Sequence, residues 1–274
     1  MSSRFLRQAC LAGLWFAGAN AAAAGLELRV CAEPDNLPYS RLDESGFENR
    51  IARLVAQDMG ASLRYFWQEQ RLGFVRKTMG AGQCDLFIGV PVGFDRVLRT
   101  RSYYRSTYVA VRRAADAPFA FEDATVRTRR IGVQLIGDDL AASPPGHALV
   151  RAGAVDNVTG FLVYGEGPAA QRMVDAVAGG AIDVALVWGP QAGWFAQRSA
   201  VPMTVQALAR PAGLPMPFSY AIAMGVPKGA VALRDRLDEI LQRRKRDIDA
   251  ILAEYAVPRV DAAPQAAPLQ GSAP

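Results

Sequence analysis

Hydrophobic positions in the first hundred residues form short apolar runs separated by segments of helical periodicity. Apolar runs at residues 26–31, 63–67 and 85–90 predict three strands, and the last has the continuous apolar character of a parallel strand buried on both faces. After Gly46 and over residues 71–79, apolar positions recur every three or four residues, which predicts two helices. Strands that alternate with helices predict an α/β lobe.

The same alternation restarts further along the chain and predicts a second α/β lobe. In chain order its expected elements are a strand at 130–135, a strand at 161–164, a helix at 171–178, a strand at 182–187 and a helix at 190–198. A helix-like segment opens at Gly137-Asp138-Asp139, and Pro144 and Pro145 are expected to break it.

The chain then returns to the first lobe through a strand at 220–226 and a long amphipathic helix at 233–255. Residues 108–112 and 220–224 are the expected hinge strands. The fold class predicted is therefore α/β, the two-lobed periplasmic solute-binding protein fold of type II, with lobes joined by two crossing strands. The expected boundaries are 25–112 with 221–257 for lobe 1, 113–220 for lobe 2, and a disordered tail at 258–274. In this arrangement the C-terminal ends of the strands of both lobes face one cleft.

The N-terminus has the pattern of a cleavable secretory signal peptide at residues 1–24. Arg4 and Arg7 precede an apolar stretch at 9–19, and small residues at 21–24 offer a cleavage site before Gly25. The apolar stretch is shorter than the ~20 residues that a membrane-spanning helix needs. We therefore expect a soluble periplasmic protein with no membrane insertion.

Composition and charge exclude some classes of partner. Hydrophobic residues make up 51% of the chain, which permits a sizeable core, and the formal net charge is +5. Without Arg4 and Arg7 the charge falls to about +3, too weak to argue for nucleic acid or a membrane surface. The basic runs at 127–130 and 243–246 are expected to be solvated faces.

Cysteine usage leaves two alternatives open. Export would leave Cys31 and Cys84, and two cysteines in an oxidising compartment favour a disulfide. Strands in register, however, would place the two residues several positions out of step, over ~10 Å apart at ~3.3 Å per residue. A disulfide needs Cα atoms within ~7 Å. The sequence does not decide between the two.

Catalytic and cofactor chemistry is not supported. The chain has one histidine, His147, in an expected loop bounded by prolines, so a histidine-based metal site is excluded and a catalytic dyad would rest on a flexible loop. Neither Cys31 nor Cys84 has a neighbouring base, and no phosphate-binding loop follows Gly165-Glu166-Gly167. The chain also lacks propeller repeats, so it is not itself a quinoprotein dehydrogenase. We expect a non-enzyme with no cofactor and no metal.

A series of short motifs resembles the quinoprotein (PQQ) dehydrogenase-associated periplasmic substrate-binding-like proteins, the MxaJ/XoxJ family. Their order and number along residues 26–258 make the resemblance specific. The motifs are CAEPDNLP at 31–38, GFEN at 46–49, GFVR at 73–76, CD at 84–85, YYRSTY at 103–108, IGVQLIGDD at 131–139, VWGP at 187–190, MGV at 224–226 and ILAEY at 251–255.

The resemblance implies a periplasmic accessory protein that works with a PQQ-dependent alcohol or methanol dehydrogenase and its c-type cytochrome. Family members are thought to assist that enzyme rather than to feed an importer. This chain departs from the family pattern around Tyr164-Gly165-Glu166-Gly167-Pro168, where it is shorter. That difference puts any cleft contact from this loop in doubt.

The positions that bind an amino acid in receptors of this fold are altered. Such receptors usually bind the ligand carboxylate with an arginine that follows a threonine after the third strand. Here the threonine is absent, and Arg96 is either a surface residue or a residue that binds the ligand. In the second lobe, such receptors usually bind the ligand carboxylate with a glycine and hydroxyl residues, whereas Asp138 and Asp139 at this place would repel it. These two residues could instead cap a helix. Together with Asp35 or Glu33 they could also supply some of the oxygen ligands of a hard metal ion. Where an acid usually pairs with the ligand amine stands Trp188, either core or a flat cleft wall.

We expect the cleft to bind a protein segment or a flat ligand, because tyrosine and tryptophan gather near the predicted strand ends. The candidate cleft residues are Glu33, Asp35, Asn36, Pro91, Tyr103, Tyr104, Arg105, Gln134, Asp138, Asp139, Trp188 and Phe218. The function predicted is a non-catalytic accessory protein that binds the dehydrogenase or assists its maturation through this cleft. The alternative is a solute-binding receptor that delivers a small molecule to an ABC importer.

Overall fold

The structure, a computed structural model, describes residues 25–136, 141–163 and 167–260. The predicted signal peptide, Asp138 and Asp139, residues 164–166 and residues 261–274 lie outside these ranges. Among the residues that are described, no helix is both long and apolar enough to cross a membrane.

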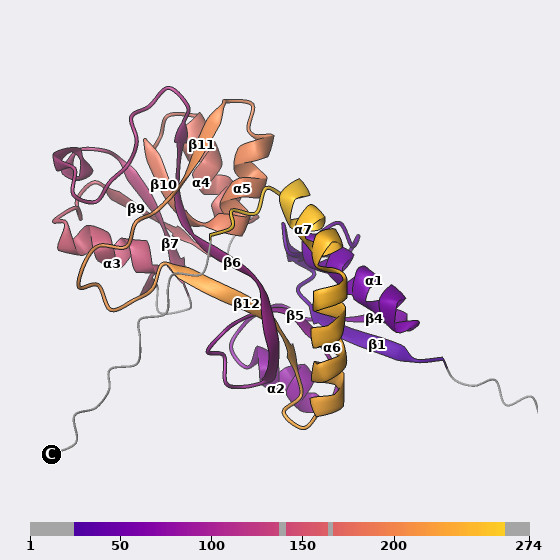
Figure 1. The fold of residues 1–274 in the computed structure, drawn as a ribbon. Helices are drawn as coiled ribbons and strands as arrows, with labels where there is room; N and C mark the ends of the chain where they lie inside the picture. Colours follow the sequence, from indigo (N-terminus) through magenta and orange to yellow (C-terminus); the bar gives the residue numbers. More distant parts are fainter. Residues whose placement is uncertain (1–24, 137–140, 164–166, 261–274) are drawn as a thin grey trace, which may run out of the picture.

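Two α/β lobes share one long strand, β6 (Leu98–Arg113), which runs from one lobe into the other (Figure 1). The first lobe contains β1 (Glu27–Ala32), β2 (Asp35–Asn36), β3 (Ser40–Arg41), α1 (Phe47–Met59), β4 (Ser62–Trp67), α2 (Phe74–Lys77), β5 (Phe87–Pro91), β12 (Ser219–Val226), α6 (Val231–Arg243) and α7 (Lys245–Glu254). The second lobe contains β7 (Ile131–Ile136), β8 (Ala141–Ala142), α3 (Pro144–Arg151), β9 (Val158–Leu162), α4 (Ala169–Ala178), β10 (Val184–Trp188), α5 (Gly189–Arg198) and β11 (Met203–Ala207).

Strand β6 of the large sheet changes its pairing partners along its length. Its strand order is β5-β12-β6-β10-β7-β8, with β11 also on β6 and β9 also on β7. Thr107 pairs with Ser219 of β12, and the next residue, Tyr108, pairs with Trp188 of β10. The hydrogen bonding of β6 therefore passes from one lobe to the other within one residue step. The lobe boundaries at 112 and 220 stay a prediction.

Helix α1 forms where the apolar spacing predicts it. Ile51, Val55 and Met59 lie on one face and are buried in the first lobe. The helix ends at Gly60, which adopts the left-handed conformation (φ 64°) that glycine tolerates best. In the second lobe, α4 likewise buries the apolar face that the sequence predicts.

Several predicted elements differ from the structure. Strand β5 pairs antiparallel with β12, and Leu86, just before it, forms an isolated parallel bridge with Val30 of β1. The helix expected over 71–79 shortens to α2 and a 3-10 turn, because Gly73 has a positive φ and the Thr78 hydroxyl donates to the Phe74 carbonyl. Strand β11 had no counterpart in the sequence prediction.

Two expected helices also begin or end differently. Pro144 and Pro145 start α3 instead of breaking a helix, since proline suits the first turn, where its missing N–H costs nothing. The long C-terminal helix divides at Arg244 into α6 and α7. The Arg244 guanidinium donates to Asp58 of α1 (2.8 Å), which ties the break to the first lobe.

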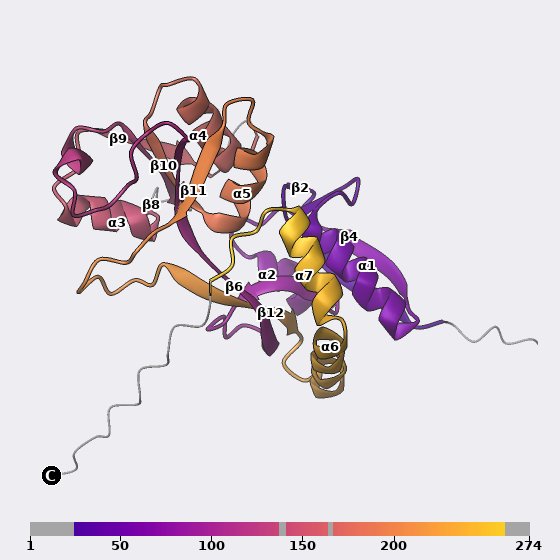
Figure 2. The same ribbon diagram turned by 45° about the horizontal axis from the view of Figure 1, so that its top comes forward.

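The C-terminal segment after α7 forms a third connection between the lobes. Tyr255 stacks on Trp194 of α5, with ring centroids 4.7 Å apart. Beyond it, the Ser106 hydroxyl donates to the carbonyl oxygen of Pro258 (2.7 Å), and the Val260 N–H donates to the carbonyl oxygen of Arg105 (3.1 Å). The prediction of disorder from residue 258 is therefore wrong for residues 258–260. Figure 2 shows α7 beside α5 and the segment crossing to the second lobe.

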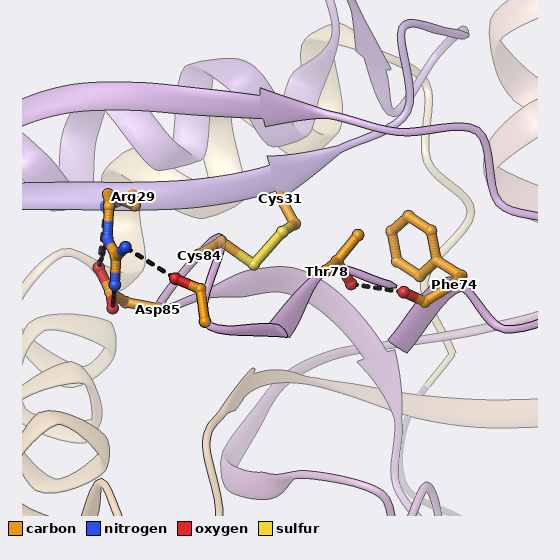
Figure 3. Close-up of a disulfide and its surroundings, with 7 residues drawn as sticks. Arg29, Cys31, Phe74, Thr78, Cys84 and Asp85 are labelled. Carbon is orange, nitrogen blue, oxygen red and sulfur yellow. Dashed lines mark hydrogen bonds and ion pairs between the residues drawn. A yellow bond between two sulfur atoms is a disulfide. The ribbon is translucent and has the colours of Figure 1, made fainter. Parts of the chain in front are cut away.

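Cys31 and Cys84 form a disulfide, with Cα atoms 5.5 Å apart (Figure 3). The expected separation of over ~10 Å between the two cysteines is wrong because Cys84 lies before β5 and is not part of a strand in register with β1. The N–H groups of Asp85 and Leu86 both donate to the Arg29 carbonyl (2.8 and 3.2 Å), which draws this segment onto β1. The Asp85 carboxylate also accepts from the Arg29 guanidinium (2.6 Å).

Candidate functional site

A cavity of about 700 Å³ lies between the two lobes. Each lobe contributes part of its wall at the ends of strands and in the loops that follow them. The first lobe supplies Cys31, Glu33, Asn36, Tyr39, Glu48, Leu72, Gly89, Pro91, Tyr104 and others, and the second supplies Gln134, Ile136, Val163, Trp188 and Gln191. The cavity thus occupies the place where a receptor of this architecture would hold a ligand.

One wall carries the carboxylate of Glu48, for which the described residues supply no partner. Glu48 lies in the first turn of α1, is half-buried and lines the cavity beside Gly89. A Cβ on Gly89 would collide with Glu48 Oε1, so this glycine makes the room for the carboxylate. Among the described residues no hydrogen bond or ion pair offsets its burial, and loss of solvent raises the pKa of Glu48 from 4.5 to about 7.

Aromatic side chains from both lobes face the same space. Tyr39 precedes α1, Tyr104 and Tyr108 lie on β6, and Trp188 ends β10. The rings of Tyr108 and Trp188 are 5.3 Å apart. Burial raises the pKa of Tyr39 and Tyr104 well above the ordinary value, so both keep their hydroxyl protons at neutral pH. A hydrogen bond with the Trp188 side chain opposes part of the rise in the pKa of Tyr39.

The indole of Trp188 combines the two roles that the sequence left open. It packs against the buried clusters of both lobes and also forms part of the cavity wall. On the same side, Gln134 Nε2 donates to Gln191 Oε1 (3.1 Å). The second lobe therefore presents a flat ring and a pair of amides to the cavity.

A second carboxylate in the wall is partly satisfied. Glu33 Oε2 accepts from the backbone N–H of Gln70 (2.7 Å). Desolvation raises the pKa of Glu33, and this hydrogen bond opposes the rise. Within the described residues no group of three or more histidine, cysteine, aspartate or glutamate side chains could hold a metal ion.

Six of the predicted cleft residues line the cavity. They are Glu33, Asn36, Pro91, Tyr104, Gln134 and Trp188. That these residues bind a ligand stays a prediction. Asp138 and Asp139 lie outside the described residues.

The other four predicted residues lie elsewhere. Asp35 is exposed and is 3.9 Å from the Arg41 guanidinium. The Tyr103 hydroxyl donates to the Ile88 carbonyl (3.0 Å), so this side chain supports β5. Arg105 is half-buried on β6, and Phe218 is 3% exposed in the core of the second lobe. The cavity wall does include Arg96, which is exposed.

Glu48 and Gln191 line the cavity but were not among the predicted cleft residues. An acid in the first turn of a helix has an ordinary explanation, since it favours the positive end of the helix dipole. Glu48 does fall within one of the family motifs, GFEN at 46–49. That motif was the one sign in the sequence that its side chain has a further role.

Comparison with known proteins places the chain in a family. No protein-family model matches it. Protein MoxJ of Paracoccus denitrificans is 32% identical over 266 residues, which cover 88% of this chain and 95% of that protein. The chain belongs to the MoxJ family. A second Protein MoxJ, from Methylorubrum extorquens, is 33% identical and covers 84% of this chain and 81% of that protein.

Solved structures of this family agree in fold. Periplasmic binding protein XoxJ from Methylobacterium extorquens AM1 is 36% identical with a TM-score of 0.72, and covers 86% of this chain and all of that one. MxaJ from a Methylophaga species is 22% identical with a TM-score of 0.75, and covers 85% of this chain and all of that one. The MxaJ/XoxJ resemblance and the type II two-lobed fold are confirmed, and the fold of these periplasmic relatives implies a periplasmic location.

Proposed function

We propose that this protein is a non-catalytic periplasmic accessory protein of a PQQ-dependent alcohol or methanol dehydrogenase. It binds the dehydrogenase, or assists its maturation, through the inter-lobe cleft and the surface around the mouth of the cavity. Membership of the MoxJ family supports the link to methanol oxidation. A c-type cytochrome that works with the dehydrogenase is part of the same proposal, as is removal of residues 1–24 on export.

The observation that carries the proposal is a rim of exposed apolar side chains around the cavity. Leu72 of the first lobe is 89% exposed, and Ile136 and Val163 of the second lobe are 44% and 37% exposed. All three line the cavity. Exposed apolar side chains that gather around one opening are typical of a surface that binds a protein. A receptor that encloses a small solute has no need of them.

The altered anchors support the same conclusion. Trp188 lines the cavity at the position where an acid would pair with a ligand amine. Arg96 is exposed, and no other described residue fixes its side chain in position to bind a ligand carboxylate. These features argue against the amino-acid zwitterion as the cargo.

The test is a pull-down from periplasm with the tagged protein, with and without the dehydrogenase expressed. Capture of the dehydrogenase or its cytochrome supports the proposal. Leu72→Glu should abolish the capture, because a charge at the rim opposes desolvation of the interface. Leu42→Glu is the matched control, since Leu42 is 63% exposed in the same lobe but does not line the cavity.

Two results would contradict the proposal. One is equal capture by both variants, which would place the interface elsewhere. The other is recovery of a small molecule and no dehydrogenase, which would favour a receptor for an ABC importer. In cells, deletion of the gene should lower active dehydrogenase without changing the uptake of any solute, and normal dehydrogenase activity would count against the accessory role.

A further inference from the structure

The Glu48 carboxylate has a use that the proposed function does not explain. We infer that the inter-lobe cavity binds an organic cation, a protonated or methylated amine, whose charge lies against Glu48 and whose apolar part contacts the aromatic walls. Two sources carry this chemistry, a free amine and a lysine side chain of a bound protein. Only the second source rests on the proposed function.

The first argument is the charge balance of the cavity. A desolvated carboxylate without a partner is costly, and a cation in contact with it removes most of that cost. The cationic residues in the cavity wall are Arg71 and Arg96, both exposed, and Arg71 Nε is 2.6 Å from Glu69 Oε2. Neither makes an ion pair with Glu48 in the described part of the chain.

The second argument is the shape and chemistry around the carboxylate. The lack of a side chain on Gly89 makes room for the Glu48 carboxylate in the cavity wall, because a Cβ there would collide with Oε1. Tyr39, Tyr104 and Trp188 line the same cavity. Cations bind well against the faces of such rings, and more strongly where water is excluded. A carboxylate among aromatic rings is therefore suited to an ammonium group.

The described tyrosines that interact with Glu48 carry no charge at neutral pH. Among the described residues, Glu48 interacts electrostatically with Tyr39, Tyr65, Tyr103 and Tyr104. Burial raises the pKa of each of these four phenols, that of Tyr65 to about 12, so all are neutral between acid and weakly alkaline pH. Of these five groups, Glu48 is the one that changes its charge between about pH 5 and about pH 8.

The first experiment is calorimetric titration of the purified protein with tetramethylammonium, whose charge does not change with pH. N-acetyl-lysine methylamide serves as the probe for a lysine side chain, and tert-butanol as a neutral compound of similar shape. Glu48→Gln should weaken binding of both cations by at least about tenfold, because it removes a charge-assisted contact. Glu33→Gln, at the other carboxylate of the wall, should change the affinity less than about twofold.

The pH series separates a cation site from a site for neutral ligands. Tetramethylammonium should bind more tightly as the pH rises from about 5 to about 8, because Glu48 must ionise to attract it. A neutral ligand that accepts a hydrogen bond from protonated Glu48 would show the opposite trend. Binding of tert-butanol as strong as that of the cations, or no binding of either cation, would overturn the inference. Retained folding of Glu48→Gln is checked by circular dichroism.

The outcome is distinguishable from that of the proposed function. Loss of dehydrogenase capture by Glu48→Gln, together with binding of the lysine probe to the wild type, assigns the cation to the partner protein. Unchanged capture with loss of tetramethylammonium binding assigns it to a free amine. A wild type that binds both cations but captures no dehydrogenase supports the cation site and contradicts the proposed function.

Discussion

Gly193 of α5 lies directly against the carbonyl oxygen of Ala256, at a distance that leaves no room for a side chain on the glycine. The contact joins the second lobe to the segment that leaves α7, and it adds to the stacking of Trp194 on Tyr255. The lobes are therefore connected by β6, by the chain that leads into β12 and by this C-terminal segment.

Gly193→Ala should displace the C-terminal segment and lower the free energy of unfolding by about 1–3 kcal/mol, because the added methyl group overpacks the contact. Urea unfolding followed by fluorescence measures the effect. Gly229→Ala is the control, since the space around Gly229 is open, and it should change stability by less than about 0.5 kcal/mol. Equal stability of the two variants would show that the contact at Gly193 is loose in solution.

Truncation tests the same segment in a different way. A chain that ends at Glu254 should be less stable than the full chain by about 3 kcal/mol or more, because it loses Tyr255 and Val257 from the core. A chain that ends at residue 260 keeps these contacts and is expected to unfold like the full chain. Equal unfolding midpoints for the two truncated chains would contradict the role given to residues 255–260.

The disulfide should contribute strongly to stability. Replacing Cys31 and Cys84 together with serine should lower the free energy of unfolding by about 2–5 kcal/mol, because the bond closes a long loop and its removal widens the unfolded ensemble. Urea unfolding of wild type and variant measures the loss. A reducing agent should lower the stability of the wild type to that of the double variant and leave the variant unchanged. If the unfolding midpoint of the wild type does not change on reduction, the result would argue against the disulfide.

Glu48 should make stability depend on pH. Its pKa is about 7 in the folded protein, compared with 4.5 for an ordinary glutamate such as that of the unfolded chain. The folded state therefore binds the proton more tightly than the unfolded state does. Stability from this group is greatest below its ordinary pKa and falls as the pH rises toward 7. Glu48→Gln lacks this loss, and should exceed the wild type by about 1–3 kcal/mol at pH 8 but by almost nothing near pH 4. Thermal unfolding of both proteins across this range provides the measurement, and parallel curves would contradict the buried state of the carboxylate.

The sequence predicted those elements whose signals are local. The apolar spacing after Gly46 and the glycine at residue 60 define α1 at both ends. Strand pairing is decided by distant segments, which is why the antiparallel partner of β5 was missed. The disulfide could not be predicted from strand register alone. It forms because the segment before β5 approaches β1, where Asp85 and Leu86 hydrogen-bond to Arg29.

The candidate site was predictable where a residue type was unusual for its place, as with Trp188. It was not predictable where the residue had an ordinary local explanation. Phe218 follows the pattern of a cleft aromatic but completes a core, and Glu48 follows the pattern of a helix start but reaches the cavity. For residues 258–260, a polar and proline-rich composition suggested disorder, whereas the Ser106 hydroxyl and the Arg105 carbonyl of β6 supply hydrogen bonds to Pro258 and Val260.

The continuity of β6 has a consequence for how this protein can be divided. Strands β10 and β11 both pair with the half of β6 that follows Thr107, while β12 pairs with the half that precedes it. A fragment that holds only the second lobe's own elements would lack the strand at the centre of its sheet. The second lobe therefore depends on a strand that begins in the first, and the two lobes should melt in one cooperative transition.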